Sequence, residues 1–507
     1  MVVGFFSLLG GLTGILVETS IAAKLGLSKS SDTFYAAYTL PYIITTLLSA
    51  TGQFSLVPFF AALEARHSAE ELWRGFSYAV NVLFLGLGAF AALGALASPW
   101  MIRGIAPGFT RPQTELATQL CPWLFLIIIP AGVVEVFRSF LLSQHRFALP
   151  SATGFFRNVT VIVVILLGFV RYGSYSIVLG YMAGYFLQLL VLGAQIVTRF
   201  QPRYSLTLVG SGEAFQNLRG AGGAQLAGAV AFQAVVVVER IIASFLPPGT
   251  LTALSYGFKI QGTLAELLGG SVGTAALPTL SRAVARQDRE EERKTFRDTL
   301  EISLVFVSPI MVFCLLLHGP IIRLVFERGN FTPEATALMA KVFFYYTLSL
   351  LPFSFIRLLT FYLFARGAGS IYLRLVTLYF GSTIGFDLLF VVVLRMGAKG
   401  IPLGLLASSI LTSLLAYTRD LSGLQACFDR MLAIFAAKTG AACALTAVVV
   451  WGLRSCVGSP RSGLGNFVWL TILCGAGSLV FLATLAALRA FPISRLAEVW
   501  QGPAQGS

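Results

Sequence analysis

The stretch "VVVVERIIASFL" (residues 235–246) places the carboxylate of Glu239 beside the guanidinium of Arg240 within an apolar run. A charged side chain at the centre of a membrane costs about 2.5–3.5 kcal/mol on insertion scales, so it normally faces a partner or a water-filled cavity. The stretch therefore predicts a membrane-spanning helix with a polar face. The function of that face has to be inferred from the rest of the sequence.

The composition indicates a protein that crosses the membrane many times. Of the 507 residues, 56% are hydrophobic and 11% are charged, and the mean hydropathy is +0.81. Soluble domains carry about 25% charged residues. The first segment, residues 2–23, lacks the basic start of a cleavable signal peptide, so we interpret it as the first span.

About 14 segments are long and apolar enough to span a bilayer, since a span needs about 20 such residues. This predicts an all-α polytopic membrane protein. The predicted spans cover residues 2–23, 33–62, 76–102, 115–142, 150–170, 174–198, 221–246, 250–280, 299–325, 336–365, 372–394, 398–418, 432–453 and 464–491.

Basic residues set the predicted orientation, because cytoplasmic loops carry an excess of Lys and Arg. The excess favours a cytoplasmic N-terminus and C-terminus, and it depends most on the loop 281–298. That loop is expected to be either a solvated linker or the start of an amphipathic helix on the membrane surface. The net charge of +14 thus reflects membrane topology, and we expect no nucleic-acid partner.

No constellation of catalytic or metal-binding residues stands out. The six cysteines form no CxxC pair, the three histidines are far apart, and HExxH does not occur. We therefore expect a transporter rather than an enzyme, with no metal and no cofactor apart from a coupling ion or the membrane potential.

Polar residues gather on two consecutive predicted spans. Gln225 and Gln233 share a helical face upstream of Glu239 and Arg240, and Lys259 and Glu266 follow on the next span. Packing between membrane helices usually needs only Ser, Thr or single amides. This set therefore predicts the wall of a hydrated cavity, in which Arg240 presents donors suited to phosphate.

A second pair of charges, Glu135 and Arg138, is spaced for contact along one helix. Residues three apart lie on the same helical face, which favours an ion pair between them.

Five ordered motifs resemble the MviN/MurJ-type lipid II flippases of the multidrug/oligosaccharidyl-lipid/polysaccharide exporter superfamily. They are "SDTFYAAYTLP" (31–41), "APGFT" (106–110), "VERIIASFLPPGTLTALSYGFKI" (238–260), "ALPTLSR" (276–282) and "LVFERGNFTPEAT" (324–336). The resemblance covers roughly residues 10–336, and the last third matches only in the number of spans.

The resemblance implies two six-helix lobes, 1–220 and 221–430, and two additional helices in 431–507. It implies a monomer in the bacterial inner membrane that moves an undecaprenyl-diphosphate-linked sugar to the outer leaflet by alternating access. The residues expected to bind the diphosphate are Lys24, Arg240 and Lys259, together with Gln225 and Gln233. The carboxylates expected to line the cavity are Glu18, Asp32, Glu239 and Glu266.

The chain departs from the family pattern at several cavity positions. Gly11, Val17 and Thr45/Thr46 stand where basic residues are usual, which leaves Arg240 and Lys259 as the principal cations. Three alternatives follow: a flippase for another polyprenyl-linked oligosaccharide, a cation-coupled drug antiporter of the same fold, or a membrane enzyme acting on such lipids. The short predicted outer loops argue against the enzyme, and the cations argue against the antiporter.

Overall fold

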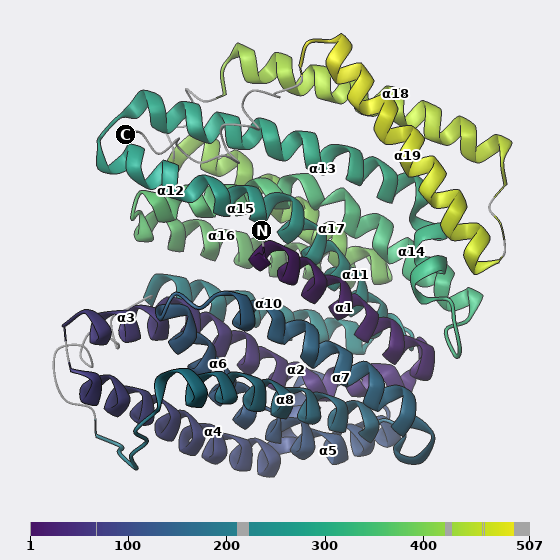
Figure 1. Ribbon diagram of the computed structural model, residues 1–507. Coiled ribbons are helices and arrows are strands. Elements are labelled where there is room, and N and C mark those ends of the chain that lie inside the picture. The colour runs from purple at the N-terminus through teal and green to yellow at the C-terminus, as the bar shows by residue number, and fades with distance from the viewer. Residues whose placement is uncertain are drawn as a thin grey trace. The chain divides into compact units, whose positions relative to one another are not determined.

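The structure is a computed structural model that describes residues 2–66, 68–209, 223–420, 428–458, 460 and 462–490. Helices dominate these residues and none of them forms a strand (Figure 1). The all-α prediction is therefore confirmed.

Eleven helices in the described part of the chain are long and apolar enough to cross a membrane, and a bent pair makes a twelfth. That pair is α14 (Pro333–Leu348) and α15 (Leu350–Ala365), which meet at 48°. The two other predicted spans are also helical, but neither is among the twelve. They are α1 (Val2–Leu25) and the run α11 (Thr250–Ala265), η2 (Glu266–Gly270) and α12 (Ser271–Ala285). The predicted count of 14 is thus not confirmed.

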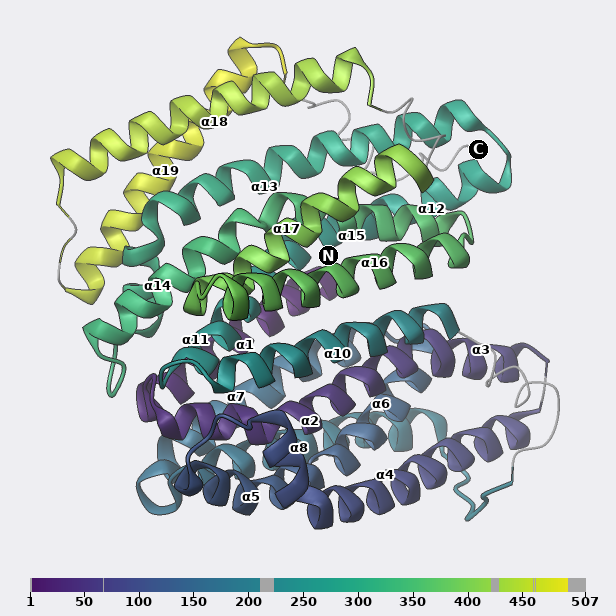
Figure 2. The same ribbon diagram turned by 180° about the vertical axis from the view of Figure 1, so that it is seen from behind.

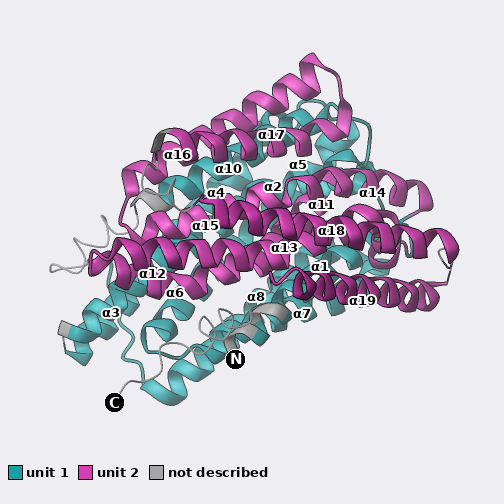
Figure 3. Cartoon of the chain, turned by 90° about the horizontal axis from the view of Figure 1, so that it is seen from above, with its two compact units in different colours: residues 1–252, 328–331 teal, residues 253–327, 332–507 magenta. Residues whose placement is uncertain are grey.

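The chain divides into two compact units, coloured separately in Figure 3. Unit 1 contains residues 1–252 and 328–331, and unit 2 contains residues 253–327 and 332–507. Helix α10 (Gly223–Ser244) falls in unit 1, whereas the sequence assigned residues 221–246 to the second lobe. The predicted lobe boundaries at 220 and 430 stay predictions.

Unit 1 is a bundle whose core is rich in aromatic rings. Phe60, Phe76 and Phe140 pack on one another with centroids 5.1–6.3 Å apart, which joins three of its helices. Besides α1 and α10, its helices are α2 (Lys29–Thr51), η1 (Gly52–Leu56), α3 (Val57–Arg66), α4 (Ala69–Ile105), α5 (Arg111–Leu126), α6 (Ile128–Ser143), α7 (Ala148–Tyr172) and α8 (Tyr175–Phe200).

Unit 2 packs its helices around the long helix α13 (Arg289–Phe326). The two last helices, α18 (Arg430–Cys456) and α19 (Gly463–Ala487), lie along α13 in both ribbon views (Figure 2). Phe313 of α13 packs there with Val450 and Trp469. The remaining elements are α16 (Gly369–Asp387), η3 (Leu388–Val393), η4 (Gly397–Lys399), α17 (Gly400–Leu415) and η5 (Ala416–Asp420).

The segment 281–298, predicted as a solvated linker or the start of an amphipathic helix, is almost entirely helical, and a helix does start within it. Only residues 286–288 interrupt the helices, because α12 ends at Ala285 and α13 begins at Arg289. Asp288 starts α13 by accepting hydrogen bonds from the amides of Glu290 (3.1 Å) and Glu291 (2.9 Å). These bonds satisfy amides that a helix leaves open at its N-terminus, and the acidic first turn suits the helix dipole.

Candidate functional site

Asp32 joins two of the sequence motifs within unit 1. It lies in the first turn of α2, is 4% exposed, and accepts hydrogen bonds from the turn between α10 and α11. Its Oδ2 accepts from the amide of Gly249 (2.6 Å), and its Oδ1 accepts from the amide (2.8 Å) and hydroxyl (2.7 Å) of Thr252. Asp32 therefore caps α11 from a neighbouring helix and satisfies amides in its first turn.

Gly249 makes this turn possible. Its φ of +85° lies in the region that only glycine adopts without strain, and an added Cβ would lie 2.9 Å from the Cβ of Leu27. The sequence "PPGT" thus places the first amides of α11 over the Asp32 carboxylate.

Two further motifs meet the same end of unit 1. The amide of Gly108, in "APGFT", donates to the hydroxyl of Ser244 at the end of α10 (3.1 Å). The amide of Asn330, in "ERGNF", donates to the carbonyl of Ala23 (2.8 Å), and its side chain donates to the carbonyl of Lys24 (2.7 Å). We call this meeting of residues 23–32, 106–110, 240–252 and 328–331 the motif junction.

Arg240 belongs to the motif junction, which answers part of the question raised by its position in an apolar run. Its Nη1 donates to the carbonyl of Leu251 (3.2 Å), and its positive charge acts electrostatically on Asp32 and Glu239. The residue as a whole is half-buried, and its Nε is fully buried. Arg240 is therefore oriented by the turn that Asp32 caps, and part of its surface remains accessible.

The predicted cavity carboxylates do not all come together. Glu18 is 5% exposed and accepts a short hydrogen bond from the hydroxyl of Tyr35. Glu266, in unit 2, is 57% exposed and forms a short ion pair with Arg357. Sequence spacing did not identify Tyr35 or Arg357 as partners, because they lie on helices that only the fold brings close.

The other predicted binding residues are dispersed. Lys24 holds its ammonium 5.8 Å from the centre of the Phe169 ring, and Lys259 lies half-buried in unit 2. Gln233 is 4% exposed, and neither atom of its amide has a hydrogen-bond partner among the described residues. The side chain of Gln225 lies outside the described part of the structure. Their joint role in one site stays a prediction.

The predicted contact between Glu135 and Arg138 is confirmed. Nη1 of Arg138 lies 3.6 Å from Oε1 of Glu135, and the same oxygen accepts a hydrogen bond from Ser49 (2.7 Å).

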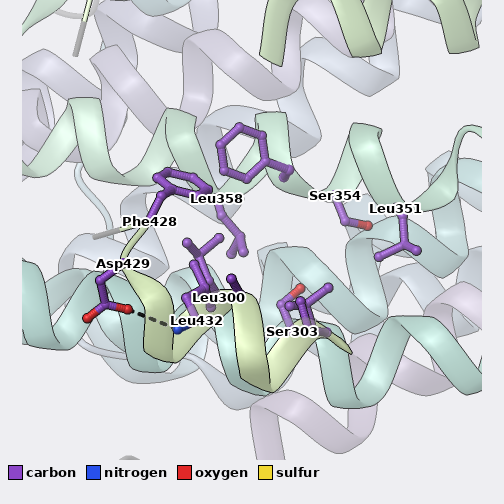
Figure 4. A pocket seen from close by; sticks show the side chains of 12 residues that line it. Leu300, Ser303, Leu351, Ser354, Leu358, Phe428, Asp429 and Leu432 are labelled. Atoms are coloured by element: carbon purple, nitrogen blue, oxygen red, sulfur yellow. Dashed lines mark hydrogen bonds between the residues drawn. The ribbon is translucent and has the colours of Figure 1, made fainter. Parts of the chain in front are cut away.

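An apolar cavity of about 270 Å³ lies in unit 2 between α13, α15 and the start of α18. Leu300, Leu358 and Leu432 come from these three helices, and Phe428 closes one end (Figure 4). Asp429 also lines the cavity, and it accepts hydrogen bonds from the amide of Leu432 and from Nη1 of Arg297, each at 2.9 Å. The cavity therefore offers hydrocarbon contacts beside one of the two additional helices.

Known proteins resemble this chain over most of its length. The family model described as "Lipid II flippase MurJ" matches residues 21–471. A probable lipid II flippase MurJ of Thermotoga maritima is 28% identical over 349 residues, covering 69% of this chain and 70% of the relative. The lipid II flippase MurJ of Burkholderia cenocepacia is 24% identical over 372 residues and is covered to 71%, as is this chain.

Solved structures share the fold. A lipid II flippase MurJ in an inward closed conformation superposes with a TM-score of 0.78 at 21% identity, covering 96% of this chain and 98% of that structure. An inward-facing multidrug resistance transporter of the MATE family has a TM-score of 0.69 at 13% identity, covering 82% and 94%. The family model spans all but a few helical turns at either end of the described chain, and the motif junction is built from the residues that carry the resemblance. The chain therefore belongs to the lipid II flippase MurJ family.

Proposed function

We propose that this chain is a flippase that moves lipid II, an undecaprenyl-diphosphate-linked sugar, from the inner to the outer leaflet of the bacterial cytoplasmic membrane by alternating access. The family match over residues 21–471 is the observation that carries this function. The chain acts as a monomer with both termini in the cytoplasm, and a coupling ion or the membrane potential drives the cycle.

The diphosphate sets the main energetic problem for such a flippase. It carries about two negative charges, and burying a charge without a partner costs far more than an apolar contact returns. Arg240 and Lys259 offset this cost through charge-assisted hydrogen bonds to the diphosphate. Arg240 donates in a bidentate geometry, and Lys259 acts as a point charge. The bond from Arg240 to the carbonyl of Leu251 supports this role, since it holds the guanidinium in place before the lipid arrives.

The polyprenyl tail needs a different surface. The tail already lies in hydrocarbon, so an apolar cavity receives it by van der Waals packing and without exposing it to water. The cavity between α13, α15 and α18 has this character. We propose that it receives part of the tail, which gives the additional helix α18 a role in substrate binding.

The alternative of a cation-coupled drug antiporter has less support. Such a transporter needs carboxylates available to a cation, whereas Asp32 accepts three hydrogen bonds and Glu18 accepts one from Tyr35. Glu266 is paired with Arg357. The likeness to MATE transporters concerns the fold, so it favours neither function.

Variants in living cells test the assignment of the cations. In cells whose own lipid II flippase is depleted, lipid II reaching the outer leaflet is measured with an enzyme or antibiotic that cannot cross the membrane. Arg240→Ala and Lys259→Ala are expected to abolish this signal at normal membrane levels, whereas Lys259→Arg retains it. Arg111→Ala is the matched control, because Arg111 is exposed and its pair with Glu115 lies at the start of α5. Full activity of both alanine variants would show that the two cations are structural.

A further inference from the structure

Unit 1 contains a polar cavity of about 270 Å³ that the proposed flipping pathway does not use. All its lining residues come from α2, α6, α7 and α8 of the same unit. The polar ones are Thr45, Ser49, Glu135, Arg138, Ser151, Thr153, Arg157, Tyr185 and Gln188. A polar cavity inside a membrane bundle is costly and marks a site for water or a ligand.

Arg157 supplies a positive charge that no carboxylate of the described residues pairs with. Its Nε and Nη2 both donate to Oδ1 of Asn158 (3.3 and 3.2 Å), and its Nη1 donates to the hydroxyl of Tyr185 (3.3 Å). These bonds use three of the five N–H groups of a guanidinium. One N–H remains on each terminal nitrogen and is available to the oxygens of an anion.

Asn158 fixes this orientation. Its Nδ2 donates to the carbonyl of Gly10 (3.1 Å) and to the hydroxyl of Thr13 (3.2 Å), which leaves Oδ1 turned toward Arg157. The Arg157 guanidinium also lies 5.2 Å from the centre of the Tyr185 ring. The free N–H groups are therefore held in place before a ligand arrives.

Gln188 is the second piece of evidence that the cavity binds a ligand. It lines the same cavity, is 5% exposed, and its Oε1 has no hydrogen-bond partner among the described residues. A buried amide oxygen without a partner costs about 1–3 kcal/mol. Because no bond holds the amide, it can rotate to present either its oxygen or its NH₂ group to a ligand.

The charge balance of the cavity indicates the sign of the ligand. The carboxylate of Glu135 is occupied by Arg138 and by the hydroxyl of Ser49, so these two charges offset each other. Arg157 remains, and the net charge of the lining is positive. An anion is therefore the ligand that this cavity would stabilise.

We propose that this cavity binds a phosphate group, held by the two open N–H groups of Arg157 and by the amide of Gln188. The phosphate comes either from a phospholipid headgroup or from free phosphate. Arg240 and Lys259 do not line the cavity, so this site is separate from the proposed diphosphate contacts and stands whether or not the chain flips lipid II.

The test uses the purified full-length chain in nanodiscs and reads the midpoint of thermal unfolding. One arm adds inorganic phosphate to phosphatidylcholine nanodiscs, and the other exchanges part of the phosphatidylcholine for phosphatidic acid without free phosphate. A bound ligand raises the midpoint in proportion to its occupancy. A rise in the first arm assigns free phosphate, a rise in the second assigns a headgroup, and no rise in either arm overturns the proposal.

Two variants locate the binding. Arg157→Gln removes charge-assisted bonds to the phosphate. We therefore expect that at least about ten times more ligand is needed for the same rise in the unfolding midpoint. Gln188→Met removes the amide at similar volume; without ligand it is expected to unfold at no lower temperature than the parent, yet its response to ligand is weaker.

One further variant serves as a control. Arg111→Gln, at the exposed start of α5, is expected to respond like the parent chain. Equal responses of the parent chain, Arg157→Gln and Gln188→Met would overturn the proposal. If Arg157→Gln does not fold, Gln188→Met decides the question alone.

Discussion

Asp32 shows how the fold uses a charge that the sequence assigned to a cavity. Both of its oxygens accept hydrogen bonds from the turn before α11, and the residue is 4% exposed. Asp32→Ala leaves the amides of Gly249 and Thr252 buried without an acceptor, at about 1–3 kcal/mol for each. We expect a clearly lower unfolding midpoint in detergent, with Asp32→Asn in between because it keeps one acceptor oxygen.

Glu64→Ala is the control for Asp32, because Glu64 is exposed on α3. It should leave the unfolding midpoint unchanged. A midpoint of Asp32→Ala equal to that of the parent would mean that the turn does not depend on this carboxylate in solution.

At the scale of residues, spacing along one helix was enough to predict the contact of Glu135 with Arg138. It was not enough to predict that Glu18 meets Tyr35 or that Glu266 meets Arg357, because those partners come from other helices. Arg157 lies within the predicted span 150–170, but the cavity that it lines is formed by four helices. Sequence patterns therefore identified which charges needed partners, and the packing decided which partners they have.

At the scale of elements, Asp429 links the start of α18 to α13. Its carboxylate accepts a hydrogen bond from the amide of Leu432 and an ion pair from Nη1 of Arg297, each at 2.9 Å. The bond from Leu432, together with the Arg297 charge, holds the pKa of Asp429 below its usual value. A lowered pKa means that the folded state favours the charged form, so the stabilisation is present above the unfolded pKa of about 3.9 and is lost as the pH falls through the folded value.

We therefore expect the difference in unfolding midpoint between the parent chain and Asp429→Ala to be present at neutral pH and to shrink below about pH 3.9. Asp429→Asn separates the two contacts, because Asn still caps a helix but does not pair with Arg297. Unfolding measured in detergent across this pH range checks the expectation. A difference that stays constant with pH would contradict an ionised cap.

The helix boundaries show where element prediction failed. The basic and acidic residues after Arg286 have the composition of a solvated segment. They form the first turns of α13 instead, because Asp288 acts as the N-cap of this helix. The apolar run 115–142 was predicted as one span, and α5 and α6 together do form one candidate span, Arg111–Ser143, although the helix is interrupted at Ile127. Hydropathy locates apolar length well, but caps and breaks depend on local hydrogen bonds that the hydropathy does not record.

At the scale of the whole molecule, the orientation in the membrane stays a prediction. The charge distribution predicts that the segment 281–298 is cytoplasmic and that the start of α14 faces outward. In a chain whose six native cysteines are replaced, Glu290→Cys and Glu334→Cys place single thiols at two exposed positions. A reagent that cannot cross the membrane should label intact cells only at position 334, and labelling only at 290 would reverse the topology.

The class and family of the molecule were predictable from sequence, because apolar length and ordered motifs are local features. The motif junction was not predictable, since its parts lie up to three hundred residues apart along the chain (for example Lys24 and Asn330). Its bonds link four of the five motifs, because each of these four supplies a donor, an acceptor or a tight turn to the same end of unit 1. The fifth, "ALPTLSR", lies in α12 of unit 2.

Transport of lipid II by the purified chain tests the central claim most directly. Proteoliposomes are made with lipid II carrying a fluorescent group, and the fraction exposed to a membrane-impermeant quencher or hydrolase is followed after an ion gradient or a membrane potential is applied. We expect the parent chain and Lys259→Arg to exchange lipid II between leaflets, whereas Arg240→Ala and Lys259→Ala match protein-free vesicles. Failure of the parent chain to move lipid II, while it moves another polyprenyl-diphosphate oligosaccharide or a cationic drug under the same conditions, would contradict the account.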